Sequence, residues 1–188
     1  MTDWLKGEFI LDEKIVYIVL SMSGTRFSRF LRLFSRLEFT HASLSFEEDL
    51  STLYSFGRKK VRMPWIAGFT VEHPNTGIFG LYDADCEVLA LKLSENDYNS
   101  LRSYCDLVLK NKDYYRYNFS GLLYTYFNRP KKLKRKYTCT QFVAATLNRG
   151  AHIEFDKDVS LVLPSDYYKL PCKSVYKGKL HSFVGSKR

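Results

Sequence analysis

Cys139 is the residue that type and position favour most as a nucleophile. It follows Thr138 at the start of 137–149 (YTCTQFVAATLNR), whose apolar spacing predicts a helix that Gly150 ends. The free N–H groups and partial positive charge at a helix N-terminus stabilise a thiolate, which is the reactive form of cysteine. The chemistry expected here is therefore nucleophilic attack by sulfur.

Such a nucleophile needs a base or an ion-pair partner, which is most often an imidazole. His41 begins the strand-like run THASLSF, and a strand packed on the cysteine helix can aim a side chain at the helix start. His73, in an irregular segment, is an alternative that could approach from a lid. His152 follows the end of the helix and is too distant, and His181 lies near the basic tail.

The order of three short motifs resembles the circularly permuted papain-like branch of the NlpC superfamily, the YiiX/YebB-like cysteine hydrolases. The motifs are THASLSF at 40–46, LYSFGRK at 53–59 and YTCTQFVAATL at 137–147. In the common NlpC order Cys precedes His. Here His41 precedes Cys139, as in the permuted branch and in the related lecithin retinol acyltransferase group. The similarity runs from the strand near Ile15 to the strand near Val175.

The resemblance implies that Cys139 is the nucleophile and that His41 is the general base and then the general acid. It also implies a third polar residue, on the neighbouring strand, that orients the imidazole. If the chain turns near Asp49, Ser55 is the polar candidate opposite His41. The family favours His, Glu, Asp or Asn there, so either the pair suffices or His73 or another group serves.

An acyl-transfer reaction also needs donors to the oxyanion, and the backbone N–H of Cys139 is one. Gln141 is a candidate for the second, because papain-like enzymes often use a glutamine, although a packing role on the helix is the alternative. Tyr17, on the first strand, is another candidate, with a core position as the alternative. The implied reaction proceeds through a thioester on Cys139 and needs no metal or organic cofactor. Peptide, cell-wall peptide and lipid acyl substrates all remain open.

The elements that must position these residues indicate an α+β fold, with an antiparallel sheet packed against helices. The expected elements are a strand at 14–20, a basic amphipathic helix at 25–37, a hairpin from 40–46 and 53–58, a strand at 87–93, helices at 94–110 and 137–149, and a strand around 173–176. Residues 114–128 are ambiguous, with a helix possible from Ser120. One domain covers 1–188, with a lead-in at 1–13 and a long irregular loop at 59–86 that could act as a lid.

The charge of the chain favours anionic partners, since its formal net charge is +9 and six basic residues fall within 129–136 (RPKKLKRK). Two readings without catalysis follow. One is a nucleic-acid-binding module that uses 129–136 with the aromatic residues of 114–127, although no RNA- or DNA-binding motif supports it. The other is a module that contacts an anionic membrane surface through the 25–37 helix and 129–136.

The compartment expected from the sequence is the cytoplasm, with contact to a membrane only as a peripheral protein. The N-terminus lacks the basic start, apolar core and cleavage site of a signal peptide, and no apolar run reaches the ~20 residues that span a bilayer. The four cysteines are widely spaced and form no CxxC pair. Neither a disulfide framework nor a zinc site is therefore expected.

Overall fold

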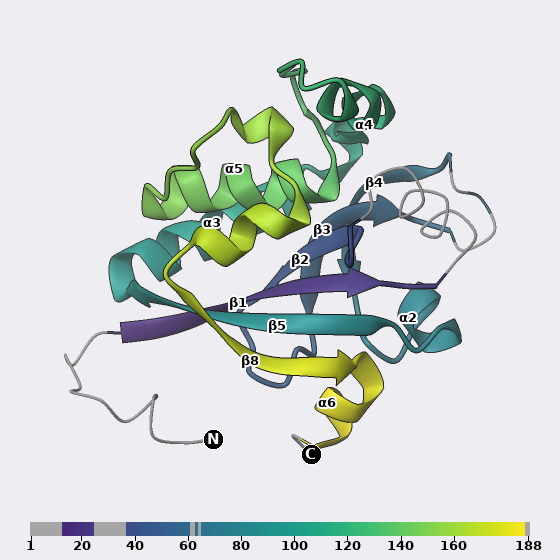
Figure 1. The fold of residues 1–188 in the computed structure, drawn as a ribbon, viewed down its shortest axis with the longest axis vertical. Helices are drawn as coiled ribbons and strands as arrows, with labels where there is room; N and C mark the ends of the chain where they lie inside the picture. Colours follow the sequence, from purple (N-terminus) through teal and green to yellow (C-terminus); the bar gives the residue numbers. More distant parts are fainter. Residues whose placement is uncertain (1–12, 25–36, 61–62, 64, 187–188) are drawn as a thin grey trace.

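The computed structural model describes residues 13–24, 37–60, 63 and 65–186. Its centre is a six-stranded sheet with the order β4-β3-β2-β1-β5-β8, in which every neighbouring pair is antiparallel (Figure 1). The strands are β1 (Glu13–Met22), β2 (His41–Ser45), β3 (Leu53–Arg58), β4 (Ala67–Glu72), β5 (Asp85–Ser94) and β8 (Cys172–Lys179). A small parallel pair joins β6 (Arg116–Tyr117) to β7 (Lys136–Tyr137).

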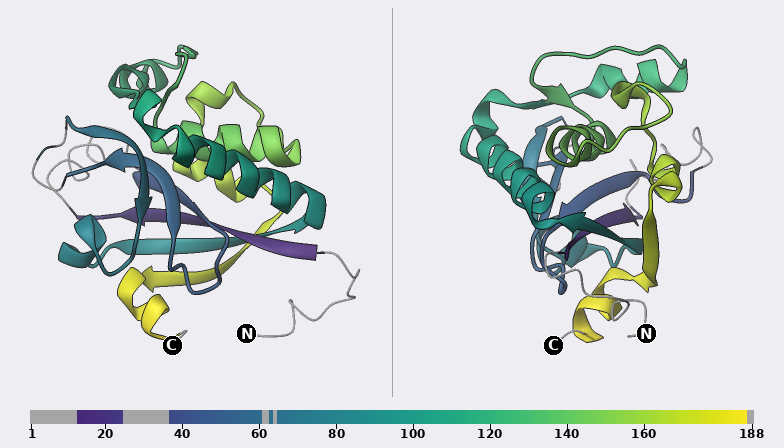
Figure 2. Two further views of the ribbon diagram at one scale, coloured as in Figure 1. Left: turned by 180° about the vertical axis from the view of Figure 1, so that it is seen from behind. Right: turned by 90° about the vertical axis from the view of Figure 1, so that its left-hand side faces the viewer.

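Helices cover the sheet and fill the connections. The α-helices are α2 (Gly77–Leu81), α3 (Glu95–Lys110), α4 (Phe119–Tyr126), α5 (Cys139–Ala151) and α6 (Leu180–Ser186). Three short 3-10 helices are η2 (Lys112–Tyr114), η3 (Val159–Leu161) and η4 (Pro164–Lys169). Helices α3 and α5 lie side by side over one face of the sheet, whereas α6 lies below the edge formed by β8 (Figures 1 and 2). The result is an α+β fold, as predicted.

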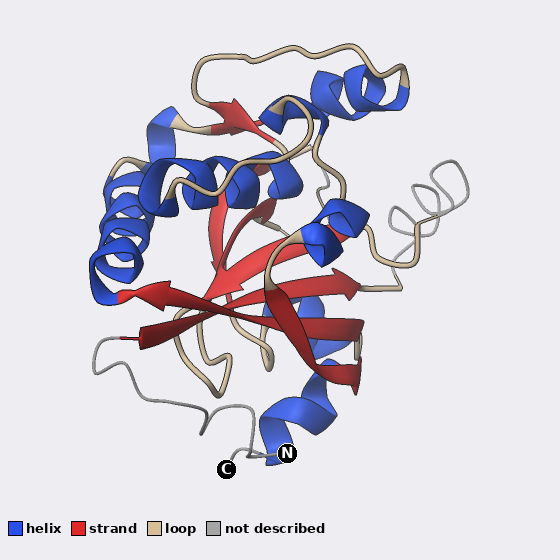
Figure 3. Ribbon diagram, turned by 60° about the vertical axis from the view of Figure 1, so that its left-hand side comes forward, coloured by secondary structure: helices blue, strands red, loops and turns tan. Residues whose placement is uncertain are grey.

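The alternation of side chains along β1 divides the core into two clusters. Val16, Ile18 and Leu20 pack into the larger cluster, which includes apolar residues of α3 and α5. Tyr17 and Val19 point the other way, into a smaller cluster that includes residues of α2 and α6. Because side chains alternate along a strand, one apolar run supplies both sides of the twisted sheet seen in Figure 3.

Most predicted elements are confirmed. The strands at 14–20 and 87–93, the hairpin and the strand near 173–176 all form, and the Ser94 hydroxyl caps α3 by accepting from the Asp97 N–H at 3.1 Å. The ambiguous aromatic segment contains α4. The predicted helix at 25–37, except its last residue, and nearly all of the lead-in lie outside the described residues. In the part of the chain that is described, no helix combines the length and apolar content that crossing a bilayer requires.

The segment 59–86 is not an irregular loop, and that prediction was wrong. It contains β4 and α2, and β4 pairs with β3 over its whole length. Phe69 is buried in the core and Val71 packs against it, whereas Thr70 and Glu72 alternate with them. This period of two is present in the sequence, but the flanking prolines and glycines obscured it.

The end of α5 is the second correction. Gly150 does not stop the helix, which continues to Ala151 and ends at His152 in the left-handed conformation with φ of 53°. Gly150 is buried against α3, where an added Cβ would lie 2.9 Å from the Leu101 Cα atom. The glycine therefore permits close packing of two helices rather than marking a terminus.

Candidate active site

Cys139 is the first residue of α5, and its position is fixed by reciprocal caps. The Thr138 hydroxyl accepts from the Gln141 N–H at 3.2 Å, and the Gln141 side-chain oxygen accepts from the Thr138 N–H at 3.0 Å. This is a capping box, and it holds the helix start rigidly. The Cys139 side chain is 5% exposed and lies close to the sheet, with Sγ 3.9 Å from the Thr40 carbonyl oxygen.

The structure brings His41 to this thiol. His41 is the first residue of β2 and directly follows Thr40, so the start of the strand meets the start of the helix. The imidazole and the thiol lie close enough for each to shift the pKa of the other. The imidazole is 21% exposed, which gives the pair a solvent-facing side. A buried thiol and a partly exposed base therefore lie side by side.

Glu72, the last residue of β4, holds the other side of the imidazole. Its Oε2 atom lies 3.0 Å from the His41 Nε2 atom, and the Ser43 hydroxyl donates to the same oxygen at 3.3 Å. Because Nε2 is engaged by Glu72, Nδ1 is the ring nitrogen left for the sulfur. The three side chains form a relay of carboxylate, imidazole and thiol, which is the arrangement of a catalytic triad.

Gly57 on β3 makes room for this relay. A Cβ atom at position 57 would lie 2.9 Å from the Glu72 Oε1 atom and 3.6 Å from the His41 Cε1 atom. The first distance is shorter than real contacts of this kind, so a side chain would displace the carboxylate. The glycine thus allows Glu72 to reach across from β4 to β2.

The pKa values of the pair shift in opposite directions. Burial favours the neutral thiol, but the neighbouring His41 and hydrogen bonds from the backbone of Ala42 and Thr140 outweigh it and lower the pKa of Cys139. Burial likewise disfavours the imidazolium, but the negative charges of Glu72 and Cys139 raise the pKa of His41 well above its ordinary value. Both shifts favour a thiolate–imidazolium ion pair.

Tyr117 on β6 completes the surroundings of the sulfur. Its hydroxyl lies near the Cys139 sulfur, and burial together with the nearby sulfur charge raises the pKa of Tyr117 well above its ordinary value. The phenol therefore stays protonated as a hydrogen-bond donor. Arg58, at the end of β3, lies near both Tyr117 and Glu72. Burial lowers the pKa of Arg58, and the charges of these two neighbours raise it by a smaller amount.

Three predicted site residues are placed elsewhere. Ser55 is fully buried and donates to the Ala42 carbonyl oxygen at 2.7 Å, so Glu72 rather than Ser55 orients His41. The Gln141 side chain is committed to the helix cap and donates to the Ser160 carbonyl oxygen at 2.7 Å, which leaves it no role as an oxyanion donor. Tyr17 pairs with Ser45 on β2, four positions or ~13 Å along the strand from His41.

The other histidines lie away from the thiol. His73 Nδ1 is 2.7 Å from the Ser51 carbonyl oxygen, and His181 Nε2 is 2.8 Å from the Phe79 carbonyl oxygen. His152 is the C-cap of α5, at the opposite end from Cys139.

Sequence reasoning missed Glu72 and Tyr117. The alternation of 69–72 could have revealed the strand that carries Glu72, but Tyr117 stands in an aromatic stretch where no spacing distinguishes it. Among the described residues, no three His, Cys, Asp or Glu side chains gather closely enough to hold a metal ion. Comparison of the chain with models of protein families, with curated proteins and with solved structures found no match.

Proposed function

We propose that this protein is a cysteine-dependent hydrolase or acyltransferase that acts on an amide, ester or thioester. The observation that carries the proposal is the juxtaposition of Cys139, at the start of α5, with an imidazole that Glu72 holds by a hydrogen bond. A buried cysteine without a function needs no charged partner, and burial alone would raise its pKa. A thiol whose pKa is lowered by an oriented imidazole is instead suited to nucleophilic catalysis.

The proposed first step is attack of the Cys139 thiolate on the acyl carbonyl carbon, which pushes the C=O electron pair onto oxygen. The oxyanion accepts hydrogen bonds from backbone N–H groups at the start of α5 and from the Tyr117 hydroxyl. The His41 imidazolium then donates its Nδ1 proton to the leaving nitrogen, oxygen or sulfur as the bond to carbon breaks. The products are a thioester on Cys139, a neutral imidazole and the protonated leaving group.

The second step regenerates the enzyme. Neutral His41 takes a proton from water, or from an acceptor alcohol, amine or thiol, as that group attacks the thioester. The carbon–sulfur bond breaks, and sulfur leaves as the thiolate beside the new imidazolium. Glu72 stays ionised throughout and holds the ring in one orientation while it gains and loses the proton.

The proposal includes a place within the permuted papain-like branch of the NlpC superfamily. Support comes from the order of the elements, because the histidine strand β2 precedes the cysteine helix α5 along the chain. The antiparallel sheet and the cysteine at a helix start fit the same scheme, and Glu72 has the residue type expected of the orienting group, although it comes from β4 rather than from the strand next to β2. Peptide, cell-wall peptide and lipid acyl groups remain the candidate substrates, and a cytoplasmic location remains part of the proposal.

The test is to trap the acyl intermediate. The protein is incubated with an activated acyl donor, such as a p-nitrophenyl ester or an acyl thioester, and its intact mass is measured at short times. We expect one acyl adduct that neutral hydroxylamine removes and that peptide mapping places on Cys139. The matched control is Cys86→Ala, which should keep the adduct. No adduct on the wild-type protein with either donor, or an undiminished adduct on Cys139→Ala, would contradict the proposal.

A further inference from the structure

A second concave site lies on the outer side of α5, away from the thiol. It is a hollow of about 400 Å³ between residues 132–137, the outer side of α5 and η3. The α5 residues that line it are Gln141, Ala145, Asn148 and Arg149. They share one side of the helix, whereas Phe142 and Val143 face the core, and Cys139, His41 and Glu72 are absent from the lining. The hollow is therefore distinct from the candidate active site.

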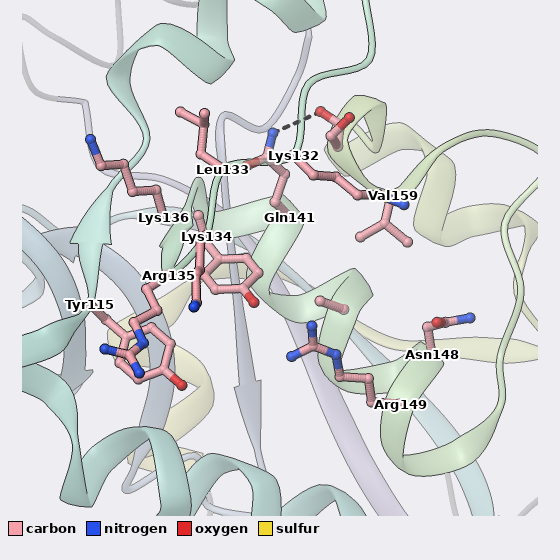
Figure 4. A pocket seen from close by; sticks show the side chains of 13 residues that line it. Tyr115, Lys132, Leu133, Lys134, Arg135, Lys136, Gln141, Asn148, Arg149 and Val159 are labelled. Atoms are coloured by element: carbon pink, nitrogen blue, oxygen red, sulfur yellow. Dashed lines mark hydrogen bonds between the residues drawn. The ribbon is translucent and has the colours of Figure 1, made fainter.

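The lining of the hollow is strongly cationic. Five basic residues line it, and no aspartate or glutamate does: Lys132, Lys134, Arg135, Lys136 and Arg149. The Lys136 side chain extends away from the others (Figure 4). Lys132 forms an ion pair with Asp158 at 3.0 Å. For the other four, no ion pair is formed with any carboxylate in the described part of the chain. Clustered cations without acids repel one another, so a bound anion would relieve an unfavourable arrangement.

The basic groups are held in place from both walls. Figure 4 shows Arg149 reaching in from α5 and Lys134 and Arg135 coming from the facing segment. The Arg149 guanidinium is fixed by the hydroxyls of Tyr104 and Tyr137. Arg135 has a positive φ of 58°, a conformation that costs free energy for a residue other than glycine and that clusters at functional sites. The two guanidinium groups are thus preorganised, Arg149 by the tyrosine hydroxyls and Arg135 by its stacking over the Tyr114 ring.

We propose that this hollow binds a small molecule that carries two or more phosphate groups. Guanidinium groups match the geometry of phosphate oxygens, and several facing cations require more than one negative charge. The tyrosine rings of Tyr115 and Tyr137, with Leu133 and Val159, provide apolar surface beside the charges. The volume falls within the range of small-molecule sites. The site stands on its own residues and does not depend on the catalytic proposal.

The experiment is isothermal titration of the full chain with sodium tripolyphosphate at low and at physiological salt. We expect saturable binding to one site, weaker at the higher salt because the attraction is electrostatic. Lys134→Gln and Arg149→Gln should each weaken binding about tenfold, as expected for loss of one charge-assisted contact. Lys179→Gln is the matched control: it removes the same charge from the end of β8, at the far end of the molecule (Figure 1), and should leave binding unchanged.

Further titrations distinguish the sources of the phosphate. A nucleoside triphosphate that binds more tightly than tripolyphosphate would assign the tyrosine surface to a base, and equal binding would assign the site to phosphate alone. Tighter binding of a soluble inositol polyphosphate would point to a lipid headgroup. Each of these results supports the site if Lys134→Gln weakens the binding of the same compound.

Three results would overturn the proposal. The first is the absence of saturable binding of tripolyphosphate at low salt. The second is equal weakening by Lys179→Gln and Lys134→Gln, which would indicate a diffuse effect of net charge. The third is binding of a single-stranded oligonucleotide without binding of tripolyphosphate, which would make the basic segment a surface track for nucleic acid. Because Lys134 is exposed, Lys134→Gln should fold. The test is therefore decisive even if Arg149→Gln fails to fold.

Discussion

Cys139 and Cys86 are two cysteines with almost the same burial and opposite chemistry. Cys86 lies on β5, is 1% exposed, and has its pKa raised to about 12 by burial and by nearby acids such as Asp83. Cys139 is 5% exposed, yet its pKa is lowered. Cys105, fully buried in α3, behaves like Cys86. Burial alone therefore does not make a thiol inert or reactive here. Cys86 and Cys105 have the cations Lys179 and Arg102 nearby, but only Cys139 has a partner, the His41 imidazole, that outweighs burial.

The partner is supplied by topology rather than by sequence proximity. Cys86 is paired within the sheet between β1 and β8, with Ser21 and Gly178 opposite it. Cys139 stands where the ends of β2, β4 and β6 converge on a helix start, and these strands bring His41, Glu72 and Tyr117. Cys86 lies in the same row of the sheet as His41, with Ser21 between them, so nearness to a strand end is not sufficient. The reactive position is the one at the start of α5 that faces the imidazole.

The largest expected effect is on thiol labelling. At neutral pH, iodoacetamide should alkylate Cys139 first, by about a hundredfold over Cys86 and Cys105, because only a thiolate attacks and those two thiols have raised pKa values. Mass-spectrometric peptide mapping at short times checks this. Cys139→Ser should abolish the fast phase, whereas Cys86→Ser should leave it intact. Equal labelling of the cysteines would remove the contrast between the two environments.

Removal of His41 should make the pKa and the reactivity of Cys139 more like those of Cys86. In His41→Ala the sulfur keeps its burial and loses the charge that lowers its pKa, so alkylation near pH 6.5 should slow by roughly tenfold to a hundredfold. The control is His73→Ala, which removes an imidazole that contacts Ser51 and should leave the rate unchanged. A similar slowing in both variants would point to a general effect on folding rather than to the ion pair.

Loss of the orienting carboxylate should have a smaller effect. In Glu72→Gln the imidazole keeps a polar neighbour but loses a negative charge, so acyl transfer should slow by about tenfold while the fold is retained. Ser55→Ala, its control, should leave the rate almost unchanged and cost about 1 kcal/mol of unfolding free energy, because the Ser55 hydroxyl bonds only to backbone. A greater loss of rate in Ser55→Ala than in Glu72→Gln would restore Ser55 as the orienting residue.

The smallest effect on chemistry is expected at Gln141. Gln141→Ala removes half of the capping box and leaves the Thr138 N–H without its side-chain partner, so the free energy of unfolding should fall by about 1–2 kcal/mol. The rate of alkylation of Cys139 should change little, since the Gln141 amide faces Ser160. A chemical denaturation curve and a labelling rate measured on one sample separate the two roles. Loss of acyl transfer with unchanged stability would show that Gln141 is an oxyanion donor.

The sequence predicted much of this arrangement because local rules determine it. The strand of 14–20 and the helices that begin near Ser94 and Thr138 each follow from residues within a few positions, and all are confirmed. Glu72 was missed because its role depends on the register of β4 against β3, which long-range pairing sets. Gly150 was misread because the same residue type ends a helix or lets two helices approach, and only the position of Leu101 distinguishes these uses.

The central claim is that Cys139 is a thiolate because His41 is an imidazolium. A lowered thiol pKa keeps the thiolate as the pH falls, and a raised imidazole pKa keeps the cation as the pH rises, so the ion pair spans the interval between the two. The direct measurement is the ultraviolet absorbance of the Cys139 thiolate as a function of pH, taken as the difference between wild type and Cys139→Ala. We expect an inflection below the ordinary thiol value of about 8.5, and a shift above that value in His41→Ala. An inflection at or above the ordinary value in the wild-type protein, or one that His41→Ala does not move, would contradict the claim.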